Sequence, residues 1–239
     1  MYGLNELNLG WTKDDDPVLV AENRRRLMEG VGGAGMALVT VGQVHSADVL
    51  TVEAQDGALE GRLGTPEGKA VLRGDGLMTD VPGVLLGIQT ADCVPVMVVD
   101  EAKRVVAVFH AGWRGTVAGI VEVGVEQMRV RYGSRVEDLS AAVGPSIGAC
   151  CYVVGEEVRS AFDAKYSYAA ELFRGGAVDL WEANRRQLLA AGVGAERIAV
   201  VGECSACARV ADDRRRYFSH RAEKGFTGRM MSVVGVVAD

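Results

Sequence analysis

This chain of 239 residues has no excess of basic residues, no long apolar run and no leader-like start. Lysine and arginine number 26 against 32 acidic residues, which gives a net charge of −6 and a sequence pI near 5.2. A surface of this charge repels polyanions and argues against a nucleic-acid binder. No apolar run is long enough to cross a bilayer. We therefore expect a soluble, cytoplasmic protein that has neither a nucleic acid nor a membrane as partner.

Histidine and paired cysteines are also scarce. The chain has three histidines and five cysteines, and an odd number of cysteines without a secretion signal indicates reduced thiols rather than a disulfide framework. Cys204 and Cys207 form one CxxC pair, but no second pair stands at a spacing typical of a structural zinc site. The adjacent Cys150 and Cys151 complete such a site poorly, so we expect both pairs to be reduced structural thiols.

The sequence does contain enough apolar material for a large core, since hydrophobic residues make up 49% of it. The simplest organisation is one domain over residues 1–239. Asp16 predicts a helix over residues 17–28, Asp179 caps a second helix, and apolar residues recur at helical spacing over 117–128. Several strands are apolar on both faces, which indicates sheet covered by helices in a layered α/β sandwich. The expected strands are residues 37–41, 49–54, 84–89, 94–99, 105–109, 141–143, 198–201 and 232–237, and residues 61–68 are typical of a surface loop.

Three side chains of the kinds that bind metals stand next to predicted strands. His45 follows the first strand, Cys93 lies between two apolar strands, and His110 ends the strand at 105–109. Strand ends hold side chains on a rigid frame yet open to solvent. Imidazole and thiolate are ligands that zinc prefers, and three protein ligands with one open position are typical of a catalytic site. Taken singly, each residue is more often a surface histidine or a small buried cysteine than a ligand.

The turn after His110 adds a group that suits anions. Gly112 and Gly115 flank Trp113 and Arg114, and such glycines permit close approach of the backbone to a ligand. The planar guanidinium of Arg114 fits a phosphate or a carboxylate with two parallel hydrogen bonds. A salt bridge at a helix start is the alternative for this arginine, with about equal weight.

Several strings in the sequence are distinctive: QVH at 43–45, GDGLMTD at 74–80, TADCVP at 90–95, HAGWRG at 110–115, and GPSIG at 144–148 with CCY at 150–152. Together they resemble the YfiH/YlmD family, also described as the multicopper polyphenol oxidoreductase (laccase) family, whose animal relatives are FAMIN-type purine enzymes. The resemblance extends from Leu7 to Met230, nearly the whole chain.

This resemblance implies a layered αββα sandwich with mixed sheets. His45, Cys93 and His110 match the family's zinc-binding, catalytic residues. Members are similar in activity to purine nucleoside phosphorylases, and adenosine deaminase activity is also reported for the family. The resemblance thus implies zinc as cofactor, and a small-molecule nucleoside and phosphate as partners.

Further candidate residues complete the expected site. Asp75 is the candidate acid or base, since a carboxylate beside a metal and a nucleobase can exchange a proton; a turn aspartate that bonds its own backbone is the alternative. The expected substrate-binding residues are Arg114, Gln43 and Arg24. We expect a monomer or a weak homodimer.

Other chemistries stay open at this point. Cys93 and His110 could form a thiolate and general base without metal, as in a Cys/His hydrolase or deamidase. A non-catalytic zinc-binding module is a further alternative. A copper polyphenol oxidase (laccase) needs a mononuclear copper and a trinuclear cluster with roughly ten histidines, so a chain with three histidines argues against it.

Overall fold

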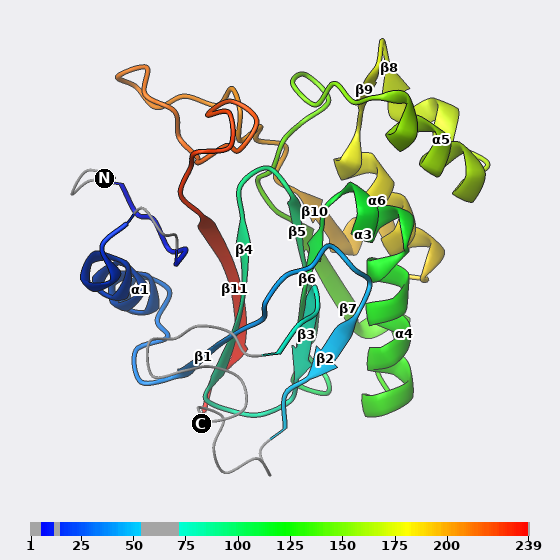
Figure 1. Ribbon diagram of the computed structural model, residues 1–239. Helices are drawn as coiled ribbons and strands as arrows, with labels where there is room; N and C mark the ends of the chain where they lie inside the picture. Colours follow the sequence, from blue (N-terminus) through cyan, green and yellow to red (C-terminus); the bar gives the residue numbers. More distant parts are fainter. Residues whose placement is uncertain (1–5, 12–14, 54–71, 239) are drawn as a thin grey trace.

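The computed structural model describes residues 6–11, 15–53 and 72–238 and arranges them in four layers (Figure 1). Helix α1 (Pro17–Gly30) lies outside a three-stranded sheet, and a six-stranded sheet follows. Helices α3 (Trp113–Val117), α4 (Ile120–Tyr132) and α6 (Leu180–Ala190) lie on the far side of the larger sheet (Figure 1). The predicted α/β sandwich with mixed sheets is therefore confirmed. No helix among the described residues is both long and apolar enough to span a bilayer.

The larger sheet has the strand order β10-β7-β5-β6-β3-β2. Its central strands β5 and β6 pair antiparallel, as do β3 with β6 and β5 with β7, whereas β2 with β3 and β10 with β7 are parallel. In chain order these strands are β2 (Val49–Thr51), β3 (Gly76–Thr79), β5 (Val94–Asp100), β6 (Val105–Ala111), β7 (Leu139–Val143) and β10 (Ile198–Val200).

The smaller sheet consists of β1 (Ala37–Thr40), β4 (Val84–Thr90) and β11 (Met230–Val236). β4 lies in the middle, parallel to β1 and antiparallel to β11. Because β4 belongs to this sheet and β5 to the larger one, the short segment 91–93 carries the chain from one sheet to the other. The remaining regular elements are α5 (Glu156–Lys165), the hairpin of β8 (Phe173–Arg174) and β9 (Ala177–Val178), and short 3-10 turns at Val136–Asp138, Ala169–Leu172 and Ala195–Arg197.

Strand β6 is buried along its whole length because it separates two cores. Side chains alternate between the faces of a strand. Ala107 and Phe109 therefore pack with the helices, while Val106 and Val108 pack in the second core, between the two sheets. The same alternation places His110 on the inter-sheet side, at the end of the strand.

Most predicted elements occur where the sequence indicated, but helix α5 and the β8–β9 hairpin were not predicted. Two further differences have a clear physical reason. The helical pattern over 117–128 is broken, because Gly119 adopts φ 79° and separates α3 from α4. Strand β3 was not predicted, since four residues beside a Gly-Asp-Gly turn carry too short a pattern. The expected loop at 61–68 lies outside the described residues.

Candidate active site

Two strand ends and the connection between β1 and β2 bring Cys93, His110 and His45 together. One ligand atom from each of these side chains lies within 4.8 Å of the others. The Cys93 Sγ is 4.0 Å from the His45 Nε2, and the two imidazole rings meet edge to face with centroids 4.9 Å apart. The three residues that the sequence singled out therefore share one site, although 65 residues separate the first from the last.

The register of the larger sheet explains this convergence. β3 pairs with β6 so that Gly76 lies opposite Phe109, which puts the preceding Asp75 next to His110. β5 pairs with β6 so that Val94 lies opposite Ala111, which puts Cys93 next to Gly112. The backbone hydrogen bonds of the sheet alone thus place Cys93, His110 and Asp75 close together, independently of contacts between their side chains.

Asp75 is fully buried and joins the two histidine segments. Its Oδ1 lies 2.8 Å from the His110 Nδ1 and accepts the backbone N–H of His45 at 2.9 Å. Its Oδ2 accepts the backbone N–H groups of Val44 and Ser46 and the Ser46 hydroxyl. These bonds hold His45 in the left-handed region at φ 64°, a conformation that non-glycine residues seldom adopt.

The electrostatics of the group favour a thiolate beside an imidazolium. Burial alone would raise the pKa of the Cys93 thiol, but the His110 and His45 rings lower it to about 6. Burial would lower the pKa of His110, but Asp75 and Cys93 raise it to about 9. The Asp75 carboxyl has a pKa of about 2, because the bonds from His110, Ser46 and His45 outweigh its burial.

Two glycines after β6 leave room for these side chains. A Cβ on Gly112 would come within 2.9 Å of the Cys93 Sγ and 3.3 Å of a His45 ring carbon. A Cβ on Gly115 would come within 3.0 Å of the Ser46 carbonyl oxygen and 3.2 Å of that of His110. The glycines of the HAGWRG string therefore fit the packing of the site.

The donor set suits a zinc ion. His110 uses Nδ1 for Asp75, which leaves its Nε2 for a metal, and this carboxylate–histidine arrangement is typical of zinc ligands. A tetrahedral zinc ion would set sulfur and nitrogen about 3.5 Å apart, given Zn–S and Zn–N lengths of about 2.3 and 2.0 Å. The observed 4.0 Å between Cys93 and His45 is close to that separation.

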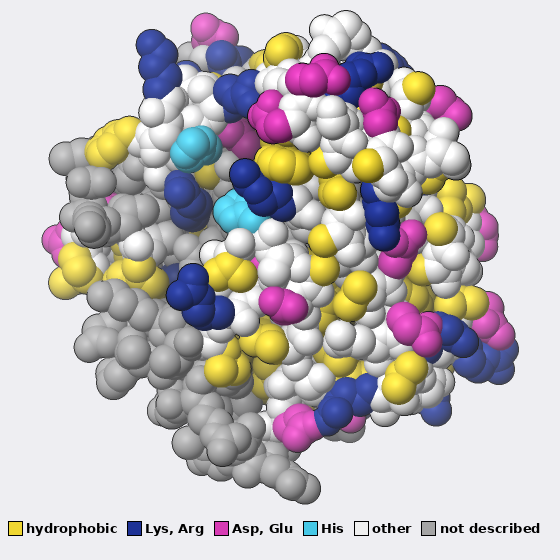
Figure 2. Space-filling model, turned by 45° about the vertical axis from the view of Figure 1, so that its right-hand side comes forward, with side chains coloured by type: hydrophobic (Ala, Val, Ile, Leu, Met, Phe, Trp, Pro, Cys, Tyr) yellow, Lys and Arg dark blue, Asp and Glu magenta, His cyan; other side chains and the backbone are white. Residues whose placement is uncertain are grey.

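A cavity of about 700 Å³ opens beside the three residues. His45, Cys93 and His110 line it, together with Arg114, whose guanidinium lies 4.4 Å from the centroid of the Trp113 ring. Figure 2 shows histidine and basic side chains gathered on one face of the molecule. A volume of this size accommodates a small organic ligand, and its basic rim suits an anion.

Two other predicted substrate-binding residues are placed differently. Gln43 lines the cavity, but its side-chain amide exchanges two hydrogen bonds with the backbone of Gln89, at 2.7 and 2.8 Å. Arg24 is buried, donates Nε–H to the Leu9 carbonyl and does not line the cavity. Its guanidinium stacks over Trp11, which does line it. Arg24 therefore lies one side chain away from the cavity.

Sequence reasoning missed part of the cavity wall. Asp92 adopts φ 91° and accepts the Ser205 hydroxyl and the Arg221 backbone N–H, each at 2.6 Å. Arg221 and Arg229 line the cavity with Arg114. The only signal for Asp92 was its position beside Cys93, and both arginines belong to the irregular segment before β11, where periodicity gives no guide.

Comparisons with known proteins identify the family of this chain. The family model described as "Multi-copper polyphenol oxidoreductase laccase" matches residues 2–237. The purine nucleoside phosphorylase YlmD of Geobacillus stearothermophilus is 38% identical over 96% of this chain and 83% of its own length. A purine nucleoside phosphorylase of Deinococcus radiodurans is 40% identical, covering 94% and 80%. An adenosine deaminase of an unknown prokaryotic organism is 38% identical, covering 90% and 82%.

A solved structure matches the fold as well. The crystal structure of YlmD from Geobacillus stearothermophilus superposes with a TM-score of 0.85 at 37% identity, covering 98% of this chain and 86% of that one. The match thus includes both sheets and the helices on either side of them. The chain belongs to the multi-copper polyphenol oxidoreductase laccase family, with YfiH and YlmD proteins as its homologues.

Proposed function

We propose that this protein is a zinc-dependent purine nucleoside phosphorylase, with adenosine deamination as a second reaction of the same site. In phosphorolysis a phosphate oxygen bonds to the anomeric carbon of the ribose, the glycosidic bond breaks, and the base leaves with a proton. The observation that carries the proposal is the convergence of two imidazoles and a thiolate beside a cavity with a basic rim. The names of the relatives give the substrate class.

His45, Cys93 and His110 would hold the metal through Nε2, Sγ and Nε2. When bound, zinc supplies a Lewis acid that polarises phosphate or lowers the pKa of water to about 7. The thiol of Cys93 is mostly ionised at neutral pH even without a metal, since its pKa is about 6. A deprotonated thiolate is the form that a metal requires.

Arg114 would bind phosphate. It stacks on Trp113 at the mouth of the cavity, which limits the conformations of its long side chain. Arg221 stacks over Tyr152 on the same wall, 5.2 Å from the ring centroid. Guanidinium groups bind phosphate oxygens in pairs, so two fixed arginines beside the metal ligands would hold phosphate near the ribose.

The surroundings of Asp75 support a positioning role over the acid or base role that the sequence suggested. Its oxygens accept three backbone N–H groups and a hydroxyl and contact His110, and the side chain is fully buried. A carboxylate with a pKa of about 2 is a weak base at neutral pH. In this role Asp75 fixes the ring of His110 and keeps its Nε2 directed at the metal.

The test is a product assay on metal-loaded protein. Inosine with phosphate should yield free hypoxanthine and ribose 1-phosphate, and omission of phosphate should stop release of the base. Inosine and ammonia formed from adenosine would demonstrate the second reaction. Protein that holds zinc yet transforms neither nucleoside would refute the proposed function.

A Cys/His hydrolase is the second candidate, because the thiolate and imidazolium of Cys93 and His110 form the pair that such an enzyme uses. The two candidates differ in their response to a chelator. Phosphorolysis that depends on zinc stops when the metal is removed and returns when zinc is restored. Activity that persists in chelator, yet disappears when Cys93 is alkylated, would favour the nucleophilic cysteine.

A further inference from the structure

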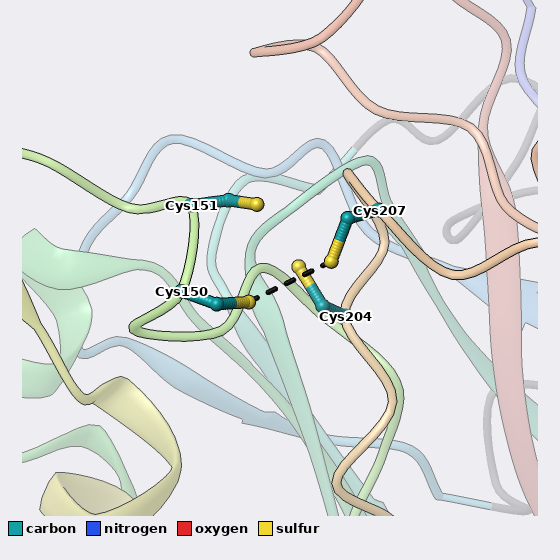
Figure 3. A group of neighbouring side chains, drawn as sticks. All are labelled: Cys150, Cys151, Cys204 and Cys207. Atoms are coloured by element: carbon teal, nitrogen blue, oxygen red, sulfur yellow. Dashed lines mark hydrogen bonds between the residues drawn. The ribbon is translucent and has the colours of Figure 1, made fainter.

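Four of the five cysteines meet at a second place in the molecule. Cys150 and Cys151 lie in the loop after β7, and Cys204 and Cys207 lie in the segment after β10. Their four sulfur atoms lie within 4.8 Å of one another, with 3.6 Å between the sulfurs of Cys150 and Cys207. Figure 3 shows the four side chains pointing into one common space. The expectation that adjacent cysteines complete the CxxC pair poorly is therefore wrong.

We propose that these four thiolates bind a second zinc ion, which holds the wall of the candidate active site in place. Tetrahedral zinc with Zn–S bonds of about 2.3 Å sets its sulfur atoms about 3.8 Å apart. The 3.6 Å between the sulfurs of Cys150 and Cys207 is close to that value, and all four sulfur atoms lie within 4.8 Å of one another. An iron–sulfur cluster distributes its cysteines over several iron atoms and so requires wider spacing.

The backbone around Cys204 is arranged to stabilise a thiolate. The Gly148 N–H donates to the Cys204 Sγ at 3.3 Å. Four thiolates so close together need a cation to balance their charge, and a divalent ion provides it.

The position of the four cysteines indicates a structural role for the proposed ion. The segment from 201 to 229 contains no named helix or strand, so few ladder hydrogen bonds hold it. At the four cysteines it is joined to the loop after β7 by a bridge between Ser146 and Cys204. Next to that bridge, Ser205 donates its hydroxyl to Asp92, the neighbour of Cys93. An ion bound to the four sulfurs would fix both partners of this contact.

The same ion would act on a second part of the cavity lining. Tyr152 follows Cys151 directly and lines the cavity, and Arg221 donates to the Val153 carbonyl at 2.7 Å. Loss of the ion would therefore loosen Tyr152 and Arg221 while the ligands on strand ends keep their places. The second zinc would have a structural and not a catalytic role, since none of its four ligands lines the cavity.

The decisive experiment removes the first site and measures the metal that remains. The variant His45→Ala with Cys93→Ser, purified in zinc-containing buffer under reducing conditions, should retain one zinc per chain. X-ray absorption at the zinc edge should show four sulfur ligands at about 2.3 Å. Replacement by cobalt should give the charge-transfer and visible bands of a four-thiolate site. None of these readouts depends on activity, so failure of the proposed function leaves them interpretable.

A matched pair of variants gives the second test. Cys150→Ser with Cys207→Ser changes two exposed side chains and should remove one zinc from the otherwise unchanged protein, with retained circular dichroism. Four freely titrating thiols without zinc in the His45→Ala, Cys93→Ser protein would overturn the proposal. So would a Cys150–Cys207 disulfide in protein kept under reducing conditions, or nitrogen and oxygen ligands in the absorption spectrum.

Discussion

The two groups of candidate metal ligands in this molecule are held in place by different means. Cys93 and His110 stand at the ends of strands whose register is set by backbone ladders, and Asp75 bonds to His110 and to the loop that carries His45. The four cysteines stand on irregular chain, where the bridge between Ser146 and Cys204 and a few neighbouring hydrogen bonds join the two segments. The first group is therefore preorganised mainly by the sheet, whereas the second has few ladder bonds and would gain order from the proposed ion.

The largest effect is expected from Cys93→Ser, which should break the first group alone. Loss of the thiolate should lower kcat/KM for phosphorolysis by about a thousandfold, equal to several kcal/mol of transition-state stabilisation. The melting temperature should change little, because Cys93 is only half-buried and the ladders remain. The matched control Cys207→Ser should show the opposite pattern: a clearly lower melting temperature and only a small change in kcat/KM. Equal loss of activity in both variants would contradict the distinction between the groups.

Asp75→Asn tests whether the sheet alone preorganises the first group. The asparagine amide has nearly the same shape, but its NH2 group would face the backbone N–H groups of Val44 and Ser46. These buried N–H groups would then lose the oxygen that accepts their hydrogen bonds. We expect a loss of up to about 100-fold in zinc affinity and about 3 kcal/mol in the free energy of unfolding. Chelator competition and urea unfolding measure the two quantities.

The same variant also tests how the stability of the protein depends on pH in acid. The pKa of Asp75 is about 2 in the folded protein and about 3.9 in an unfolded chain. Its ionised form therefore stabilises the fold above about pH 4, and this contribution is lost as the pH falls toward 2. Asp75→Asn should lack this acid-dependent part of the unfolding curve. An identical acid limb in both proteins would refute the role of Asp75.

The first group could be read from the sequence because its residues stand beside strong local signals. His45 and His110 follow β-branched apolar runs, Cys93 lies between two, and the glycines of the HAGWRG string mark a tight turn. These signals marked each residue as a candidate, and the resemblance to the YfiH/YlmD family grouped the three residues into one site. The function of Asp75 could not be read, because its bonds depend on the register of β3, a strand too short for periodicity to reveal.

The second group could not be read from the sequence for a related reason. More than 50 residues separate Cys151 from Cys204, and neither pair lies on a helix or strand whose pairing brings the two together. Spacing rules for zinc sites assume two CxxC pairs, and the adjacent Cys150 and Cys151 do not fit them. The same applies to Asp92, whose partners Ser205 and Arg221 come from the irregular segment.

Thiol reactivity in zinc-free protein sharpens the comparison without any substitution. The Cys93 thiol has a pKa of about 6 and should be alkylated at a rate that rises with pH and levels off above about 7. The pKa of Cys151 is about 11, so its rate should continue to rise beyond pH 9. At pH 7 Cys93 should react about 50-fold faster than Cys151. The Cys151 thiolate is the stronger nucleophile, but so little of it is present at this pH that Cys93 reacts faster.

Mass spectrometry of timed samples measures this ratio, after removal of metal with a chelator. Zinc added beforehand should protect Cys93, because a metal-bound thiolate reacts slowly. Equal rates at the two cysteines in zinc-free protein would show that the imidazoles do not lower the pKa of Cys93.

The smallest effect is expected from Gly112→Ala, which adds one methyl group to the first site. That Cβ would come within 2.9 Å of the Cys93 Sγ, so the sulfur must shift while the backbone, at φ −64°, accepts alanine without strain. We expect about a tenfold loss of zinc affinity with an unchanged fold. The control Gly30→Ala adds a methyl group with no atom within 4 Å, so zinc affinity should not change. If Gly112→Ala binds zinc as tightly as the control, the strand ends tolerate more movement than a preorganised site allows.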